Sequence, residues 1–209
     1  QPFVYGFRGR MDERYDCVRS VTDGRFVYLR NYMPHLSQGQ HVNYQFETPS
    51  TRVWRQLYDA GKLTPEQSIF WKTPKAPEEL YDLQSDPDEV HNLAVQPEHT
   101  ATLAKMRAAQ ENLALKIRDA GMVAEGEMHH RAEGTTPYDM AHDDSMYPLA
   151  RILKAAGAAS SMKPDAMVDL KAGFADKDSA IRYWSAMGIL MRGGDGMSAA
   201  HDEITQAAK

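Results

Sequence analysis

Short runs that alternate between apolar and polar positions dominate the first part of the chain. Residues 17–21 and 25–30 are rich in β-branched and aromatic side chains, and the turn signal Thr22-Asp23-Gly24 separates them. This pattern predicts an antiparallel hairpin. Residues 1–6 have the character of a strand that precedes the hairpin, and the run 79–83 predicts another short strand at an edge of the same sheet.

A helical period follows the predicted sheet. Leu103, Met106, Leu113 and Ile117 fall on one stripe of a helix over residues 98–119, and we expect this long helix to pack on the sheet. Between the hairpin and the last strand, the pattern predicts a long irregular loop and two helices. These are a loop over 31–50, a helix over 52–60 capped by Thr51, and a helix that starts at Thr64-Pro65-Glu66.

The C-terminal third of the chain is Ala-rich and helical in pattern. Between 121 and 147 the periodicity disappears, which predicts a linker or wrapping loop. The chain therefore divides into segments 1–120, 121–147 and 148–209. In the last segment we predict helices over 149–159, 164–173 and 179–191 and another near Ser198, with Asp178 capping the third helix and pairing with Arg182.

Composition excludes several classes of protein. The 209 residues carry 24 Lys and Arg against 29 Asp and Glu, so no basic excess favours nucleic acid. No stretch approaches the roughly 20 apolar residues that a membrane span needs. The single cysteine, Cys17, cannot form an internal disulfide, and a buried structural role in the predicted strand is favoured over an activated nucleophile. Because the chain opens within a strand and lacks an initiator Met, we expect a fragment of a longer protein.

Self-contained catalytic motifs are absent from the sequence: it has no G-x-S-x-G elbow, P-loop, H-E-x-x-H pair or EF-hand loop. One cluster has ligand types for a divalent metal but no defined spacing, so a polar loop is the favoured interpretation. Its members are Glu127, His129, His130, His142, Asp143 and Asp144.

The densest group of charges lies where the first strand ends, from Arg8 to Arg14. Its arginines could hold an anionic group bidentately, while Asp12 and Glu13 could accept hydrogen bonds from sugar hydroxyls. The alternative is a solvated loop with surface ion pairs, which contribute little to stability.

The order of these features resembles the C-terminal subdomain of sulfatases, close to bacterial relatives of heparan N-sulfatase (sulfamidase). The runs that carry the resemblance are 7–16 (FRGRMDERYD), 18–21 (VRSV), 25–32 (RFVYLRNY), 78–83 (EELYDL), 86–89 (DPDE) and 92–94 (NLA). Two further runs resemble the tail of a subgroup in which HEAT-like helical repeats follow the sulfatase unit. These are 126–129 (GEMH) and 176–184 (DKDSAIRYW).

The resemblance implies an α+β fold: a small antiparallel sheet with a packed long helix, as part of an alkaline-phosphatase-like fold, then a truncated, all-α HEAT-like segment. It also implies a sulfatase that uses calcium and a formylglycine made from a C/S-x-P-x-R motif. Cys17 is followed by Arg19 and Val21 where that motif has Pro and Arg, and Ser85 is followed by Pro87 but then by Glu89. No catalytic or metal residue is therefore carried over, and we expect the nucleophile and metal site to lie upstream and the chain alone to be inactive.

The subdomain's role in contacting substrate does carry over. The candidate substrate-binding residues are Arg10, Asp12, Glu13, Arg14 and, from the long loop, His41. The expected partner is a sulfated saccharide or other sulfated small molecule, as an O- or N-sulfate, and the resemblance implies an exported enzyme whose signal lies outside this chain. The competing hypothesis is a non-catalytic helical-repeat scaffold that binds a protein partner.

Overall fold

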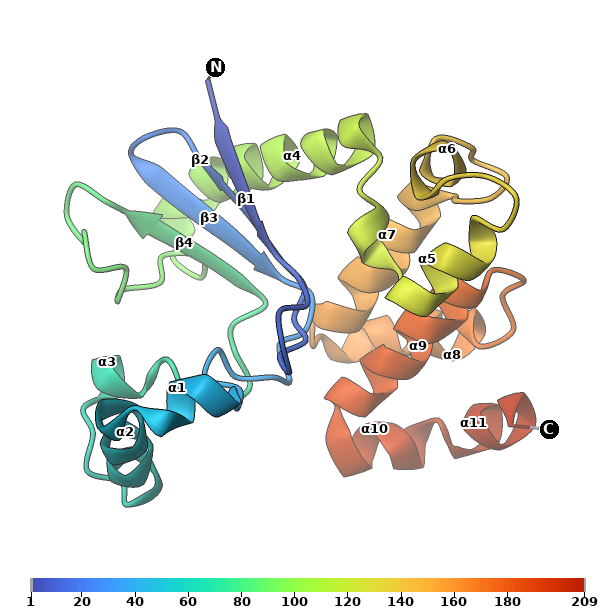
Figure 1. Cartoon of the computed structure of the whole chain (residues 1–209). Helices are drawn as coiled ribbons and strands as arrows, with labels where there is room; N and C mark the ends of the chain where they lie inside the picture. The colour runs from blue at the N-terminus through green and yellow to red at the C-terminus, as the bar shows by residue number, and fades with distance from the viewer. Residues whose placement is uncertain (1, 209) are drawn as a thin grey trace. The chain divides into compact units, whose positions relative to one another are not determined.

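The computed structural model describes residues 2–208 (Figure 1). The chain forms two compact units, Gln1–Gln110 and Glu111–Lys209, which are described separately below. Unit 1 holds the sheet, and unit 2 is helical. Within the described residues, none of the helices combines the length and apolar character that crossing a bilayer requires.

Unit 1 is built on a four-stranded antiparallel sheet in the order β1-β2-β3-β4. The strands are β1 (Val4–Arg8), β2 (Val18–Thr22), β3 (Phe26–Asn31) and β4 (Glu78–Asp82). The predicted hairpin and the later strand are confirmed. Gly24 occupies the left-handed region of the β2–β3 turn at φ +93°, a conformation that an L-residue side chain disfavours.

A long helix covers one face of this sheet, as predicted (Figure 1). It is α4 (Thr100–Ile117), preceded by the short turn η1 (Pro97–His99). Val21, Tyr28 and Leu80 are paired across β2, β3 and β4 and form one row of the core. Leu103 and Met106 of the helix pack on that row. The apolar stripe of the helix and the apolar face of the strands therefore bury each other. Ile117, predicted on the same stripe, is exposed.

Asp23 ties the hairpin turn to the long helix. Its carboxylate accepts hydrogen bonds from the backbone N–H of Phe26 at 2.9 Å and of Arg25 at 3.2 Å, and the Lys105 ammonium lies 2.9 Å away. The Lys105 contact, followed by the Phe26 N–H, lowers the pKa of Asp23 to about 2.

We expect Asp23→Ala to lower the free energy of unfolding by about 1 kcal/mol at neutral pH, as for loss of a capping carboxylate. Because the folded chain binds the Asp23 proton more weakly than the unfolded chain, this stability is present above the ordinary aspartate pKa and is lost as the pH falls toward 2. Urea titrations of both proteins from neutral pH downward measure the difference. If the difference in unfolding free energy between the wild type and Asp23→Ala persists unchanged at acidic pH, the ionic role of the carboxylate is contradicted.

Three shorter helices complete unit 1: α1 (Asn43–Glu47), α2 (Pro49–Asp59) and α3 (Pro65–Ser68). The predicted start at Thr64 is confirmed as a capping box, in which the Thr64 hydroxyl accepts from the Gln67 N–H and the Gln67 side chain accepts from the Thr64 N–H. The predicted start of α2 after Thr51 is wrong. The helix begins at Pro49, because proline fits the first helical position where no N–H is needed.

Unit 2 consists of short helices and helical turns (Figure 1). They are η2 (Ala120–Met122), α5 (Glu125–Arg131), α6 (Pro137–Ala141), α7 (Leu149–Ser160), η3 (Pro164–Ala166), α8 (Met167–Gly173), α9 (Ser179–Met191), α10 (Gly193–Ala199) and α11 (His201–Ala207). The helices predicted after residue 148 are thus present. Their classification as HEAT-like repeats, and the division at 120 and 147, stay predictions.

The stretch 121–147 is not an irregular loop, since α5 and α6 lie within it. Arg131 joins this stretch to the start of α9: its guanidinium donates to the Asp178 carboxylate at 2.9 and 3.1 Å and to Glu127 at 2.7 Å. Asp178 caps α9, as predicted, but the predicted pairing with Arg182 is wrong. Arg182 instead donates to backbone carbonyl groups of the preceding turn.

Candidate functional site

The charged loop after β1 forms a tight hairpin turn. Met11 and Arg14 exchange backbone hydrogen bonds in both directions, each of 3.0 Å. Asp12, at the first central position, lies in the left-handed region at φ +50°, which Asp adopts more readily than most residues. The sequence predicted the cluster of charges but not this turn, at whose tip Asp12 and Glu13 are exposed.

A second segment, residues 38–43, is hydrogen-bonded along this loop. The Arg8 guanidinium donates to the Gln38 carbonyl at 3.0 Å. The Gln40 side-chain amide donates to the Tyr15 carbonyl at 3.0 Å and accepts from the Tyr15 N–H at 3.4 Å. The Glu13 carboxylate accepts from the Asn43 N–H at 3.4 Å. These contacts fix the charged loop against the segment that carries His41.

The predicted site residues differ in their exposure to solvent. Arg10, Asp12, Glu13 and His41 are exposed, and the His41 ring packs on Phe46 with a centroid distance of 4.6 Å. Arg14 is half-buried. The structure therefore brings Glu13 and the His41 segment together, while His41 itself rests on an aromatic neighbour.

Arg14 carries an unsatisfied donor. Its Nε is buried without a hydrogen-bond partner among residues 2–208, and its Nη2 lies 4.0 Å from the weak acceptor Sδ of Met11. Buried donors are almost always paired, so the Arg14 N–H is a candidate donor to a ligand at the charged turn. A carboxylate or sulfate oxygen is the acceptor that guanidinium groups bind most strongly.

Below the loop lies a buried ion pair that the sequence analysis missed. The Lys75 ammonium is 2.6 Å from the Asp16 carboxylate, and the two side chains are 3% and 0% exposed. Burial lowers the pKa of Lys75, and Asp16 opposes that shift. Arg8 extends the pair, with its Nε 3.9 Å from Asp16. The two partners lie 59 positions apart in the sequence, and the only local signal for the pair is a lone Lys between two prolines.

A second buried polar group was also missed. The Glu79 carboxylate accepts from the Asn31 amide at 2.5 Å and from the Tyr81 hydroxyl at 2.7 Å. Burial, and then Glu79 itself, raises the pKa of Tyr81, so that hydroxyl remains a donor at physiological pH. The group fixes the start of β4 next to β3 and thereby supports the sheet beneath the loop.

The sequence also offered Cys17 as a possible nucleophile and a cluster of possible metal ligands. In the structure, Cys17 is buried and Glu127 of the cluster is held by its neighbours. Cys17 is 4% exposed, in agreement with a buried thiol. In the metal-ligand cluster of the sequence, Glu127 is held by Arg131 and by a short hydrogen bond from Ser179. No group of three or more His, Cys, Asp or Glu in residues 2–208 could hold a metal ion, so none of these side chains is assigned to calcium.

Comparison with known proteins shows that part of this chain is similar to a sulfatase. No family model matches the chain. The ulvan-active sulfatase of Formosa agariphila is 32% identical over 126 residues, which cover 60% of this chain and 21% of that relative. The chain contains a sulfatase-related region. It spans about a fifth of the length of this relative, and the mixed α/β unit with its small antiparallel sheet is compatible with a sulfatase C-terminal subdomain.

Proposed function

We propose that this chain is the C-terminal part of a sulfatase that hydrolyses sulfate esters or sulfamates of sulfated saccharides. The similarity to an ulvan-active sulfatase supports the reaction class. The observation that carries the site is the unpaired, buried Nε of Arg14 at a tight turn that also presents Arg10, Asp12 and Glu13. We assign the turn to contacts with the anionic and hydroxyl groups of the saccharide.

The formylglycine and the calcium ligands belong, in this proposal, to the remainder of a longer chain, and the 209 residues alone are inactive. An exported location and the sulfamidase-like subgroup are part of the same proposal and rest on the resemblance of the sequence. The sequence upstream of Gln1 tests it directly. A C/S-x-P-x-R motif within a few hundred residues is expected, and its absence would favour the helical-repeat scaffold that binds a protein partner.

In the complete enzyme, Arg10→Ala, Glu13→Ala and Arg14→Ala should each lower kcat/KM for a sulfated saccharide by about 10- to 150-fold, the effect of losing one charge-assisted contact. Turnover of a small aryl sulfate should change little, because such a substrate does not extend to the turn. Steady-state kinetics with both substrates measure the two effects.

Lys62→Ala is the matched control, since it removes an exposed cation from the turn after α2. It should leave both activities unchanged. Equal losses on the two substrates would mean that the turn supports the fold or the sulfate pocket. No loss on either would mean that the loop is only a solvated ion-pair surface.

A further inference from the structure

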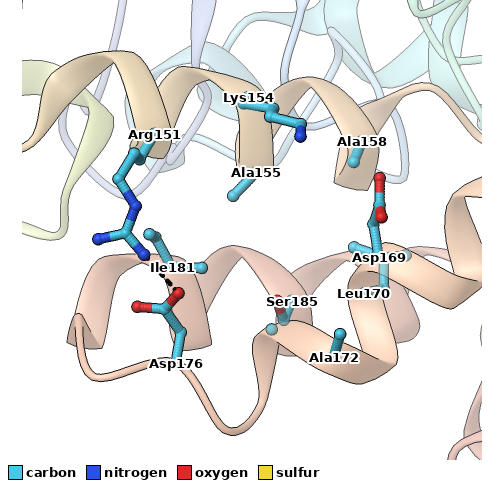
Figure 2. Close-up of a pocket in the computed structure, with 11 residues that line it drawn as sticks. Arg151, Lys154, Ala155, Ala158, Asp169, Leu170, Ala172, Asp176, Ile181 and Ser185 are labelled. Atoms are coloured by element: carbon cyan, nitrogen blue, oxygen red, sulfur yellow. Dashed lines mark hydrogen bonds and ion pairs between the residues drawn. The ribbon is translucent and has the colours of Figure 1, made fainter.

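A cavity of about 310 Å³ lies within unit 2 (Figure 2). Helix α7 forms one wall, and α8 with the start of α9 forms the other. The α7 residues that line it follow helical spacing along a single stripe. The eleven lining residues are Arg151, Lys154, Ala155, Ala158, Asp169, Leu170, Ala172, Gly173, Asp176, Ile181 and Ser185.

Small side chains keep the space open. Ala155 and Ala158 on α7 face Ala172 and Gly173 on α8, where larger side chains would fill the volume. At Gly173 an added Cβ would lie 2.0 Å from the Ser185 hydroxyl, so the glycine lets that hydroxyl form part of the floor. A volume of this size is at the lower end of the roughly 300–1,000 Å³ found for sites that hold whole small molecules.

Ser185 gives the cavity a polar group among its small apolar side chains. The residue is 2% exposed and lines the space, and its hydroxyl has no hydrogen-bond partner among residues 2–208. Ser160, on the neighbouring helix, shows the usual arrangement, in which the hydroxyl donates to the carbonyl four residues earlier at 2.7 Å. Because the hydroxyl lines the open space, a ligand inside the cavity can accept its hydrogen bond.

The charges around the cavity define the ligand further. Arg151 and Asp176 pair at 2.6 Å and close one end (Figure 2). Lys154 from α7 and Asp169 from α8 also line the cavity, and neither has an ion-pair partner among the described residues. One open cation and one open anion do not suit a polyanion, and none of the eleven lining residues offers the aromatic face on which a sugar ring would stack.

We propose that this cavity binds a short peptide with free ends, of about dipeptide size. Its carboxylate pairs with Lys154, and its ammonium group pairs with Asp169. Small apolar side chains of the peptide fill the space over Ala155 and Ala172. A peptide carbonyl accepts a hydrogen bond from the Ser185 hydroxyl. The proposal is independent of sulfatase activity, because every group in it belongs to unit 2.

The test uses the ¹⁵N-labelled 209-residue chain and L-alanyl-L-alanine as the probe. Titration into the millimolar range should produce saturable shifts of the backbone amides that line the cavity. N-acetyl-L-alanyl-L-alanine lacks the ammonium group and L-alanyl-L-alanine amide lacks the carboxylate, so each should bind about two- to fivefold more weakly, as expected for one exposed ion pair.

The protein variants must match the ligand variants. Lys154→Gln should weaken binding of the free dipeptide and leave the affinity for the amide, which lacks the carboxylate, unchanged. Asp169→Asn should weaken binding of the free dipeptide and leave the affinity for the acetylated form, which lacks the ammonium group, unchanged. Ser185→Ala should weaken every form by about two- to tenfold. Ala155→Leu should abolish binding by filling the cavity, whereas Ala150→Leu, exposed on the same helix and outside the lining, should not.

Three results would overturn the proposal. The first is the absence of saturable shifts for the wild-type chain, and the second is a set of shifts that maps outside the cavity. The third is undiminished binding by Ala155→Leu or Ser185→Ala when their spectra show intact folds. If the acetylated amide, which carries neither charge, binds as well as the free dipeptide, the assignment to Lys154 and Asp169 is wrong.

Discussion

Asp16→Ala is expected to lower the free energy of unfolding of unit 1 by about 3–5 kcal/mol, the cost of removing one partner from a buried ion pair. The Lys75 ammonium, 3% exposed, would then be buried without its carboxylate. Hydrogen exchange read by mass spectrometry separates the two units, so that peptides from β2 and β3 report unit 1 and those from α9 report unit 2. Only the unit 1 peptides should lose protection.

The pH dependence distinguishes this electrostatic cause from a simple loss of packing. Burial already lowers the pKa of Lys75 in the folded chain, and removing Asp16 deepens that shift. The unfolded chain then binds the Lys75 proton more tightly than the folded chain, so stability rises with pH up to the ordinary lysine pKa. The variant should therefore recover stability at alkaline pH more than the wild type does.

The double variant Asp16→Leu with Lys75→Met is the control. Replacing both charges by apolar side chains is often neutral, so it should be much less destabilised than Asp16→Ala and should show no alkaline recovery. If the single and double variants are equally unstable, the pair contributes through its shape and not through its charge. This matters for the proposed site, because Asp16 also contacts Arg8, where the charged turn begins.

Local signals account for the elements that the sequence predicted correctly. The hairpin follows from β-forming runs on either side of a turn that contains Gly24, and α3 follows from Thr64, Pro65 and Gln67 at their capping positions. The long helix follows from an apolar period sustained over many turns, although Ile117 at its end is exposed. In each case the information lies within a few residues of the element.

Failures occurred where the deciding contact is distant in the sequence. The helices of 121–147 are five and seven residues long, too short for a period to show, and they are held by bonds such as Arg131 to Asp178, 47 residues away. The four-residue spacing predicted that the Asp178 carboxylate pairs with Arg182, but Arg131 binds this carboxylate instead. At the candidate site, composition indicated the cluster of charges, but the turn that holds it, the Asp16–Lys75 pair and the Gln40 bridge need the fold.

Trp184→Ala should have the largest effect in unit 2, about 3–5 kcal/mol, as for other buried large aromatic side chains. The indole is 1% exposed, and its Nε1 donates to the Met122 carbonyl at 2.8 Å. Trp184→Phe keeps most of the buried area but leaves that carbonyl without its donor, which should cost about 1–3 kcal/mol. Leu190→Ala, exposed on the same helix, is the control and should stay within about 0.5 kcal/mol of the wild type.

Hydrogen exchange in these variants also tests where the helical unit begins. Because Trp184 of α9 binds the carbonyl of Met122, residues near η2 should lose protection together with α7 and α9 in Trp184→Ala, as one cooperative unit. Peptides from 121–147 that exchange early in the wild type, and do not respond to the substitution, would instead support a separate linker between residues 120 and 148. The Phe variant decides whether the hydrogen bond alone couples η2 to α9, since it removes that bond while leaving most of the ring in place.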